Sequence, residues 1–251
     1  MFTSRTENHV RRPLPLFRCN PFQPAVIQHP SQSFHSFALN YKKIPFKLVP
    51  LPLDSIEPTA KSIGAAPTTT SADGSPKYTI PFIRDHDNDK VISDSLAIAK
   101  YLDEAYPDTP KLFAEGSEKA QGDLINAWMV SMRTLLPIVT PKLQALASEE
   151  MKEARKRRGQ VYGSGDPLTK EQETEAWNKS KQAFEKVVAD GNARDSDYVY
   201  ANLVLAALAW TAGIALGEDS EEWREMRSWG NGRLGEVADA AIEGESQMVS
   251  P

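Results

Sequence analysis

Two adjacent polar residues, Asp94 and Ser95, stand at the start of the apolar-periodic segment "SLAIAKYLDEA". A helix that begins there leaves its first backbone N–H groups without intrahelical partners, and its dipole places positive potential at the same end. Such an end attracts a carboxylate, so the pair could hold an acidic group of a ligand. The alternative is structural, because Asp and Ser are also preferred N-cap residues in many proteins.

A second unusual feature lies shortly before this helix. Residues 78–83, "YTIPFI", have the aromatic and β-branched composition of a strand. Pro81 stands in the middle, although proline cannot donate to a sheet ladder and is confined to edges, bulges or the first residue of a strand. Two interpretations are therefore open. Either this segment is not a strand, or Pro81 has a specific role at the start of the strand.

The sequence predicts no metal site. Residues 85–89, "DHDND", begin like a calcium loop, but Lys90 stands where the loop needs glycine and Leu96 where it needs glutamate. We expect a hairpin turn there instead. The four histidines lack the spacing of metal ligands, and the chain has no glycine-rich phosphate-binding loop.

The composition excludes further classes. A net charge of −5 gives no reason to expect nucleic-acid binding. The single cysteine, Cys19, permits neither an internal disulfide nor a Cys-x-x-Cys redox pair. This cysteine usage fits a reducing compartment, so a cytoplasmic protein is expected.

The first half of the chain alternates short elements. We expect a helix over 31–43, a strand over 46–51, a helix over 54–64, a loop over 65–76, strands over 78–83 and 90–92, and a helix over 94–108. Pro50 and Pro52 mark the strand at 46–51 as an edge strand. Leu96, Ala99 and Leu102 form one apolar stripe of the last helix. This order is most of a thioredoxin-like fold, and the sole candidate for its first strand is "PAVIQH" at 24–29.

The second half reads as all helical. Helices are expected over 117–136, 147–159, 170–190, 199–216 and 219–234, and Thr169 with Gln172 fits a capping box. Residues 199–216 carry no charge, and eighteen residues is the lower limit for a membrane span. Acidic residues flank both ends, without the Lys/Arg bias that orients a span. We therefore expect the central helix of a helical domain and no membrane association.

The combination of "TIPFI" with "SDSLAIAKYLDEAYPD" twelve residues later resembles the soluble glutathione transferases. The segments "ALNYKKIPF", "EPTAKSIGAAPTTTSADGSPKYTIPFI" and "LGEDSEEWREMRSWGNGRLG" resemble the fungal branch related to bacterial β-etherases. The resemblance implies an α/β, thioredoxin-like N-terminal domain followed by an all-helical (all-α) C-terminal domain. We place a disordered or atypical leader at 1–24, the glutathione-binding domain at 25–113 and the helical domain at 114–251.

The resemblance also implies roles for the residues introduced above. Pro81 would be cis and open a strand, so that the backbone of Ile80 meets the cysteinyl part of glutathione. Ser95 would bind the γ-glutamyl carboxylate through its hydroxyl and amide, and Asp94 would bind the γ-glutamyl ammonium. Glutathione would be the co-substrate, and apolar side chains around Trp128, Met132 and Leu136 would line the site of the second substrate. Apolar residues at that spacing are, however, first of all core residues.

The chain departs from this family at the catalytic position. In the fungal branch a serine opens the first helix, whereas here His29 stands at that place in "HPSQSF". Ser31 follows Pro30 at the first turn of the expected helix, where its hydroxyl and amide can both point into a cleft. We therefore take Ser31 as the catalytic residue, with a protonated His29 as the alternative donor, and we expect weak activity because the usual serine position is His29.

Two functions follow from these residues. The first is an enzyme of detoxification that activates the glutathione thiol for attack on an apolar electrophile or an aryl ether, with a homodimer as a possible assembly. The second is a non-catalytic relative that binds apolar ligands or a protein partner, which the loss of serine at His29 favours. Retention on immobilised glutathione, followed by turnover with a general electrophile, separates the two.

We expect replacement of Ser31 to slow glutathione-dependent turnover. A hydroxyl that donates to a thiolate stabilises it by about 1.5–3 kcal/mol, which lowers the thiol pKa by roughly one to two units. Without this donor the bound thiol would titrate near the free-cysteine pKa of about 8.5. Ser31→Ala should reduce turnover at neutral pH by about an order of magnitude and move the pH profile of turnover upward.

His29→Ser is the matched comparison, because it restores serine where the resemblance places it. If His29→Ser raises turnover near neutral pH while Ser31→Ala changes nothing, Ser31 is not the catalytic group. Fast turnover of the parent with an apparent pKa of about 6–7 would instead show that His29 does not occupy the position of the missing serine.

Overall fold

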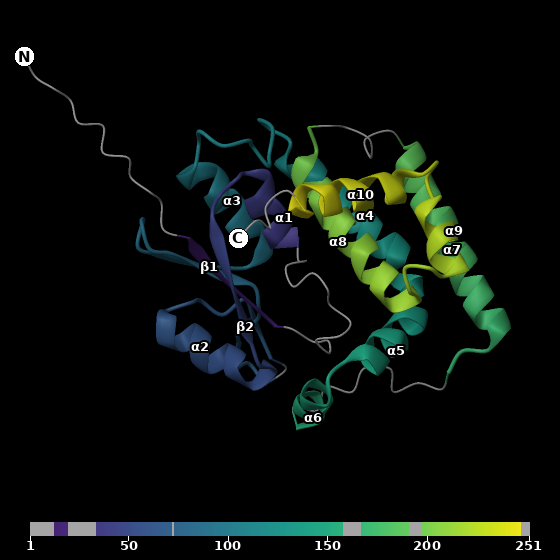
Figure 1. Ribbon diagram of the computed structural model, residues 1–251, viewed down its shortest axis with the longest axis horizontal. Helices are drawn as coiled ribbons and strands as arrows, with labels where there is room; N and C mark the ends of the chain where they lie inside the picture. Colours follow the sequence, from purple (N-terminus) through teal and green to yellow (C-terminus); the bar gives the residue numbers. More distant parts are fainter. Residues whose placement is uncertain (1–12, 20–33, 72, 158–166, 191–196, 247–251) are drawn as a thin grey trace, which may run out of the picture.

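The computed structural model describes residues 13–19, 34–71, 73–157, 167–190 and 197–246. Its first part is built on a mixed sheet, and its second part is helical (Figure 1). The elements of the first part are β1 (Leu14–Cys19), α1 (Phe34–Tyr41), β2 (Phe46–Leu51), η1 (Leu53–Ser55), α2 (Ile56–Ile63), β3 (Thr69–Thr70), β4 (Pro76–Lys77), β5 (Phe82–Asp85), β6 (Lys90–Ser93) and α3 (Ser95–Ala105). This is the thioredoxin-like arrangement that the sequence predicts.

The four-stranded sheet has the order β2-β1-β5-β6. β1 pairs in parallel with β2, so that Leu16 lies opposite Leu48, and pairs antiparallel with β5, so that Leu16 also lies opposite Ile83. β5 and β6 form an antiparallel hairpin. β2 is an edge strand, as Pro50 predicts, since a missing donor is tolerated there.

The position of the first strand corrects the sequence analysis. β1 occupies Leu14–Cys19, inside the segment predicted to be a leader, and the assignment of this strand to 24–29 is wrong. The prolines at 13 and 15 obscured an alternating pattern in which Leu14 and Leu16 are both buried. Phe17, on the other face, stacks on Phe82 at 4.8 Å between ring centroids. Burial on both faces therefore outweighs the poor strand propensity of proline.

Two smaller differences lie nearby. The expected loop at 65–76 contains β3 and continues into β4, which form a two-stranded hairpin whose Thr68 and Thr79 hydroxyls hydrogen-bond at 2.6 Å. Leu96 does not join the buried stripe of α3, because it is 44% exposed while Ala99 and Leu102 are buried. The first turn of α3 therefore leaves Leu96 outside the core.

Helices cover both faces of the sheet. α1 and α3 pack on the face that carries Leu14, Leu16 and Ile83, and α2 packs on the face that carries Phe17 and Phe82 (Figure 1). α2 ends at Gly64, whose φ of 79° is the left-handed conformation that closes many helices. The sheet is therefore the middle of three layers.

The second part consists of α4 (Glu118–Met132), η2 (Arg133–Leu135), α5 (Leu136–Leu146), α6 (Glu149–Arg157), α7 (Lys170–Ala189), α8 (Val199–Leu216), α9 (Glu221–Arg227) and α10 (Arg233–Ser246). The capping box of Thr169 and Gln172 is present at the start of α7. The sequence analysis did not assign α5, which contains two prolines. Pro137 lies in the first turn, where proline is tolerated, whereas Pro141 lies inside the helix.

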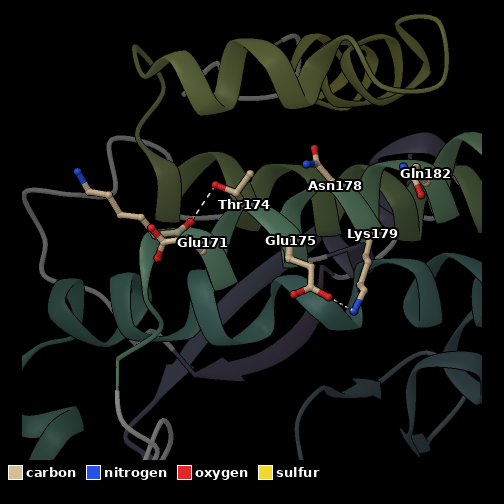
Figure 2. A pocket seen from close by; sticks show the side chains of 7 residues that line it. Glu171, Thr174, Glu175, Asn178, Lys179 and Gln182 are labelled. Atoms are coloured by element: carbon tan, nitrogen blue, oxygen red, sulfur yellow. Dashed lines mark hydrogen bonds and ion pairs between the residues drawn. The ribbon is translucent and has the colours of Figure 1, made fainter.

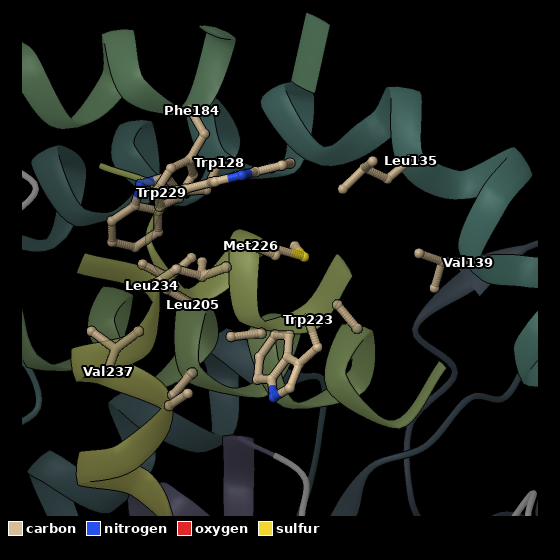
Figure 3. Close-up of a cluster of buried hydrophobic side chains, with 14 of the residues drawn as sticks. Trp128, Leu135, Val139, Phe184, Leu205, Trp223, Met226, Trp229, Leu234 and Val237 are labelled. Atoms are coloured by element: carbon tan, nitrogen blue, oxygen red, sulfur yellow. The ribbon is translucent and has the colours of Figure 1, made fainter. Parts of the chain in front are cut away.

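α8 is the central helix of this part. It is the one helix of the described residues that is long and apolar enough to cross a membrane, and half of it is buried inside the protein. It lies among α4, α5 and α10 (Figure 1). Figure 3 shows the core around it, in which Trp128, Phe184 and Trp229 lie together. The burial of α8 by these neighbours supports the core-helix prediction.

The first turn of α8 is capped by a side chain from another helix. Its N-cap residue, Tyr198, makes no side-chain cap bond. Instead, Oε1 of the buried Gln121 of α4 accepts from the Ala201 N–H at 2.9 Å, and its Nε2 donates to the Leu112 carbonyl at 3.2 Å. Leu112 also accepts from the Tyr200 N–H at 3.2 Å. The start of α8 is thus held by α4 and by the segment between the two parts.

Residues 85–89 form the predicted hairpin turn, organised by the buried Asp85. Its carboxylate accepts hydrogen bonds from the Tyr106 hydroxyl at 2.6 Å and the Tyr101 hydroxyl at 2.7 Å. It also accepts from Asn88 Nδ2 at 2.8 Å. Burial alone would raise the pKa of Asp85, but these hydrogen bonds outweigh it and lower the pKa to about 2.

We expect Asp85 to stabilise the fold in a pH-dependent manner. A folded-state pKa of about 2 against an ordinary value of 3.8 corresponds to about 2 kcal/mol. Because the folded-state pKa is the lower one, this contribution is complete above about pH 4 and is lost as the pH falls toward 2. Asp85→Asn should therefore lower the free energy of unfolding in urea at pH 7, by an amount that shrinks below pH 4.

Asp89→Asn is the matched control for this experiment. It makes the same change of charge in the same turn, and its φ of 50° suits asparagine, so it should leave the free energy of unfolding nearly unchanged. A loss for Asp85→Asn that stays constant from pH 7 to pH 3 would contradict the role of the charge.

Candidate functional site

The start of α3 has the geometry that Asp94 and Ser95 predict. Asp94 is the N-cap, and its Oδ1 accepts from the Leu96 N–H at 3.0 Å and the Ala97 N–H at 3.1 Å. Ser95 is the first helical residue. Asp94 has φ 77° and ψ 138°, an uncommon conformation for a residue with a Cβ. Such conformations cost of order 1–3 kcal/mol and cluster at functional sites.

The β5–β6 hairpin brings the two sequence motifs together. Phe82, the first residue of β5, lies opposite Ser93, the last residue of β6. Residues 80–81 and 94–95 therefore lie at the same end of the hairpin. The Ile80–Pro81 peptide bond is cis, as expected, and Pro81 directly precedes β5. Ile80 lies before the first paired residue of β5, and among the described residues its backbone makes no hydrogen bond to other backbone groups.

The predicted catalytic residue cannot be placed beside this pair. Ser31 and His29 lie in the segment 20–33, outside the described residues. The role of Ser31 stays a prediction.

A groove of about 600 Å³ opens beside Asp94 and Ser95. It lies between the first turns of α3 and α4. Its lining combines charged side chains with apolar ones: Asp94, Ser95, Leu96, Lys100, Phe113, Glu118, Lys119, Gly122, Ile125 and Tyr200. A salt bridge between Lys100 and Glu118 joins the two helices across it. The groove can thus accept a ligand with charged groups at one end and apolar surface at the other.

Two aromatic residues that the sequence analysis did not single out line the groove. Tyr200 of α8 is buried and packs against Phe113, with 4.9 Å between ring centroids. Burial and the nearby Asp94 carboxylate both raise the pKa of Tyr200, so its hydroxyl keeps its proton. No local signal marked Tyr200, because it lies in an apolar run 105 positions after Ser95 in the chain.

The segment before α4 that carries Phe113 is fixed by a buried carboxylate. Asp103 of α3 accepts from the N–H groups of Leu112 and Phe113 at 3.0 Å each through Oδ2. Lys42, which is fully buried, donates to Asp103 Oδ1 at 2.6 Å and to the Pro110 carbonyl at 2.9 Å. Burial lowers the pKa of Lys42, although the hydrogen bond and the negative charge of Asp103 act to raise it. This ion pair sets where Phe113 lies relative to α3.

Two other cavities offer less chemistry. The residues drawn in Figure 2 line a shallow surface depression, and all of them come from α7. Glu175 and Lys179 are paired there across one helical turn. A cavity of about 280 Å³ lies between η1 and α6, where Arg157 pairs with Asp54. Neither cavity is lined by residues of the two sequence motifs.

Family models match both parts of the chain. The glutathione S-transferase N-terminal domain matches residues 36–110, and the glutathione S-transferase C-terminal domain matches residues 123–243. The chain belongs to the glutathione transferase superfamily. The two matches agree with the thioredoxin-like and helical parts of the fold.

Solved structures and a curated relative support the same family assignment. A glutathione S-transferase of Ceriporiopsis subvermispora, crystallised in complex with glutathione, is 27% identical with a TM-score of 0.80, over 96% of this chain and 99% of that one. Glutathione transferase GSTFuA3 of Phanerochaete chrysosporium is 26% identical with a TM-score of 0.79, over 93% and 98%. The glutathione S-transferase-like protein ustS of Aspergillus flavus is 28% identical, over 82% of this chain and 80% of that protein.

We expect Asp94 to stabilise α3 as its N-cap. Replacing an N-cap Asp by Ala costs about 1 kcal/mol, and the positive φ of 77° adds a penalty for alanine. Asp94→Ala should therefore lower the midpoint of thermal unfolding. Asp94→Asn is the matched variant, because asparagine caps helices as well as aspartate does and tolerates positive φ. Its midpoint of thermal unfolding should equal that of the parent. Equal loss in both variants would contradict the capping role.

Proposed function

We propose that the protein is a glutathione transferase that binds glutathione at the start of α3 and presents its thiol to an apolar electrophile. The observation that carries the proposal is the position of Ile80–Pro81 and Asp94–Ser95 at one end of the β5–β6 hairpin. Asp94 and Ser95 also line the groove between α3 and α4. The glutathione in the Ceriporiopsis structure supports it, since that protein matches nearly the whole chain.

The cysteinyl and γ-glutamyl parts of glutathione each have a complementary group. The backbone of Ile80 suits pairing with the cysteinyl backbone, because Ile80 lies just before the paired residues of β5 and makes no backbone hydrogen bond among the described residues. The Ser95 hydroxyl and the positive end of α3 suit the γ-glutamyl carboxylate. The carboxylate of Asp94 caps the helix through one oxygen and supplies the negative charge that suits the γ-glutamyl ammonium.

The reaction follows from thiolate chemistry. The cysteinyl thiol loses its proton, and the thiolate forms a sulfur–carbon bond with the electrophile while a leaving group departs or an activated double bond takes up a proton. A hydroxyl that donates to the thiolate lowers the pKa of the thiol and raises the thiolate fraction. We assign this role to Ser31.

An apolar stripe of α4 supports an apolar second substrate. Gly122, Ile125 and Met129 follow the i, i+3, i+7 spacing of one helix face. The first two line the groove, and Met129 is 51% exposed. Leu96 faces the same groove from α3. Trp128, which the sequence analysis placed at the second-substrate site, is fully buried in the helical core instead.

The finer assignments are part of the same proposal. The resemblance of the sequence to the branch related to β-etherases favours aryl ethers among the electrophiles. A cytoplasmic location fits the single cysteine and the supply of reduced glutathione there. A homodimer is the assembly that we expect, and light scattering coupled to size-exclusion chromatography tests it.

The second candidate is a glutathione-transferase-like binder without turnover. It is favoured by His29, which stands where the related sequences carry the catalytic serine. Both candidates retain the site at Asp94 and Ser95. Glutathione binding without measurable conjugation of a general electrophile or cleavage of a β-aryl ether would select the binder.

We expect Ser95→Ala to weaken glutathione binding. The lost hydrogen bond to a charged group is worth about 1.5–3 kcal/mol, or roughly a 10- to 150-fold rise in Kd. The helix should be little affected, because Asp94 remains its cap. Isothermal titration calorimetry of parent and variant measures this effect.

Ser62→Ala is the control for this titration. Ser62 is an exposed serine of α2 whose hydroxyl donates to the Thr59 carbonyl, and it does not line the groove. Its replacement should leave Kd unchanged. An equal Kd for parent and Ser95→Ala would refute the proposed role of Ser95.

A further inference from the structure

Tyr200 brings a polar group of the helical part to the groove at the start of α3. It lines the groove together with Asp94 and Ser95. It comes from the first turn of α8, whereas Asp94 and Ser95 come from the thioredoxin-like part. The same groove is therefore lined by residues from both parts of the protein.

The ring of Tyr200 is held firmly in this place. Only 4% of the residue is exposed, and Ala38 of α1, Ala99 of α3 and Val204 of α8 belong to the same buried cluster. Its backbone N–H donates to the Leu112 carbonyl, and its ring packs on Phe113. Leu112 and Phe113 are themselves fixed by the Asp103 carboxylate. A ring held from so many sides loses little further freedom when a ligand binds.

The electrical surroundings keep the Tyr200 hydroxyl protonated. Burial disfavours the phenolate, and the negative charge of Asp94 disfavours it further. A protonated phenol can donate a hydrogen bond, which a carboxylate accepts strongly. Lys100 and Lys119 also line the groove, but they are paired with Glu118 and Asp123. The positive potential for an incoming anion therefore comes from the N-terminus of α3.

We propose that Tyr200 binds glutathione directly, by donating a hydrogen bond to the γ-glutamyl carboxylate beside Ser95. The proposal rests on the function proposed above. It makes the helical part a contributor to glutathione binding and not only to binding of the second substrate. The competing explanation is that Tyr200 serves only as packing between the two parts.

Tyr200→Phe separates these explanations, because it removes the hydroxyl and keeps the ring. If Tyr200 binds the carboxylate, Kd for glutathione measured by calorimetry should rise about 10-fold or more, the scale of a hydrogen bond to a charged group. The second probe is 4-aminobutyryl-cysteinyl-glycine, which keeps the ammonium and lacks the γ-glutamyl carboxylate. Parent and Tyr200→Phe should bind this peptide with the same Kd.

Tyr198→Phe is the matched control variant. Tyr198 is the half-buried N-cap residue of α8, two positions before Tyr200, and it does not line the groove. It should bind both probes as the parent does. The midpoint of thermal unfolding of each variant checks that the fold is intact.

The outcomes are distinct. Unchanged glutathione affinity in Tyr200→Phe, with Ser95→Ala weakened, overturns the role of Tyr200 and leaves the proposed function standing. Equal loss of affinity for both probes in Tyr200→Phe assigns Tyr200 to packing and also overturns the proposal. No glutathione binding by the parent overturns the proposed function and this inference together.

Discussion

The arrangement of the two parts depends on one buried carboxylate, that of Asp103. It is paired with the fully buried amino group of Lys42 and accepts from two consecutive backbone N–H groups, those of Leu112 and Phe113. Removing one partner of a buried pair is costly, because the other charge stays buried without compensation. The pair therefore ties the chain after α1, the helix α3 and the segment before α4 into one unit. Every groove residue of the helical part follows that segment in the chain.

The second buried carboxylate, Asp85, acts on the same helix. It holds Tyr101 of α3 and Tyr106 just after it, while Asp103 holds the segment beyond. The C-terminal half of α3 is thus fixed by charged hydrogen bonds on two sides. Its first turn, with Asp94 and Leu96 exposed, is left at the groove. A site residue on a helix anchored in this way is positioned before any ligand arrives, which is the requirement for precise binding.

Local signals were sufficient for much of the fold. The capping box at Thr169, the apolar α8 and the glycine that closes α2 are properties of a few adjacent residues, and the sequence predicts each of them. β1 was missed because its prolines conceal a pattern whose stability comes from strands distant in the chain.

The residues of the site likewise fall into those that local sequence motifs reveal and those that they do not. Pro81, Asp94 and Ser95 belong to short motifs and could be found from the sequence, and the cis bond at Pro81 is confirmed. Tyr200 and Gln121 act across long separations: Gln121 caps a helix that begins 78 positions later in the chain. Contacts of this kind exist only once the chain has folded. A single sequence therefore gives no pattern from which to predict them.

The place of β1 in the sheet has a consequence for shortened forms of the protein. β1 comes first in the chain but is a central strand of the sheet, with β2 on one side and β5 on the other. A transcript or a proteolytic product that lacks residues 14–19 would not simply be a smaller version of the same fold. It would have two facing strand edges without partners and a gap where Leu14 and Leu16 fill the core. Unpaired strand edges recruit other chains, so such a form should be found in aggregates or be degraded by proteases.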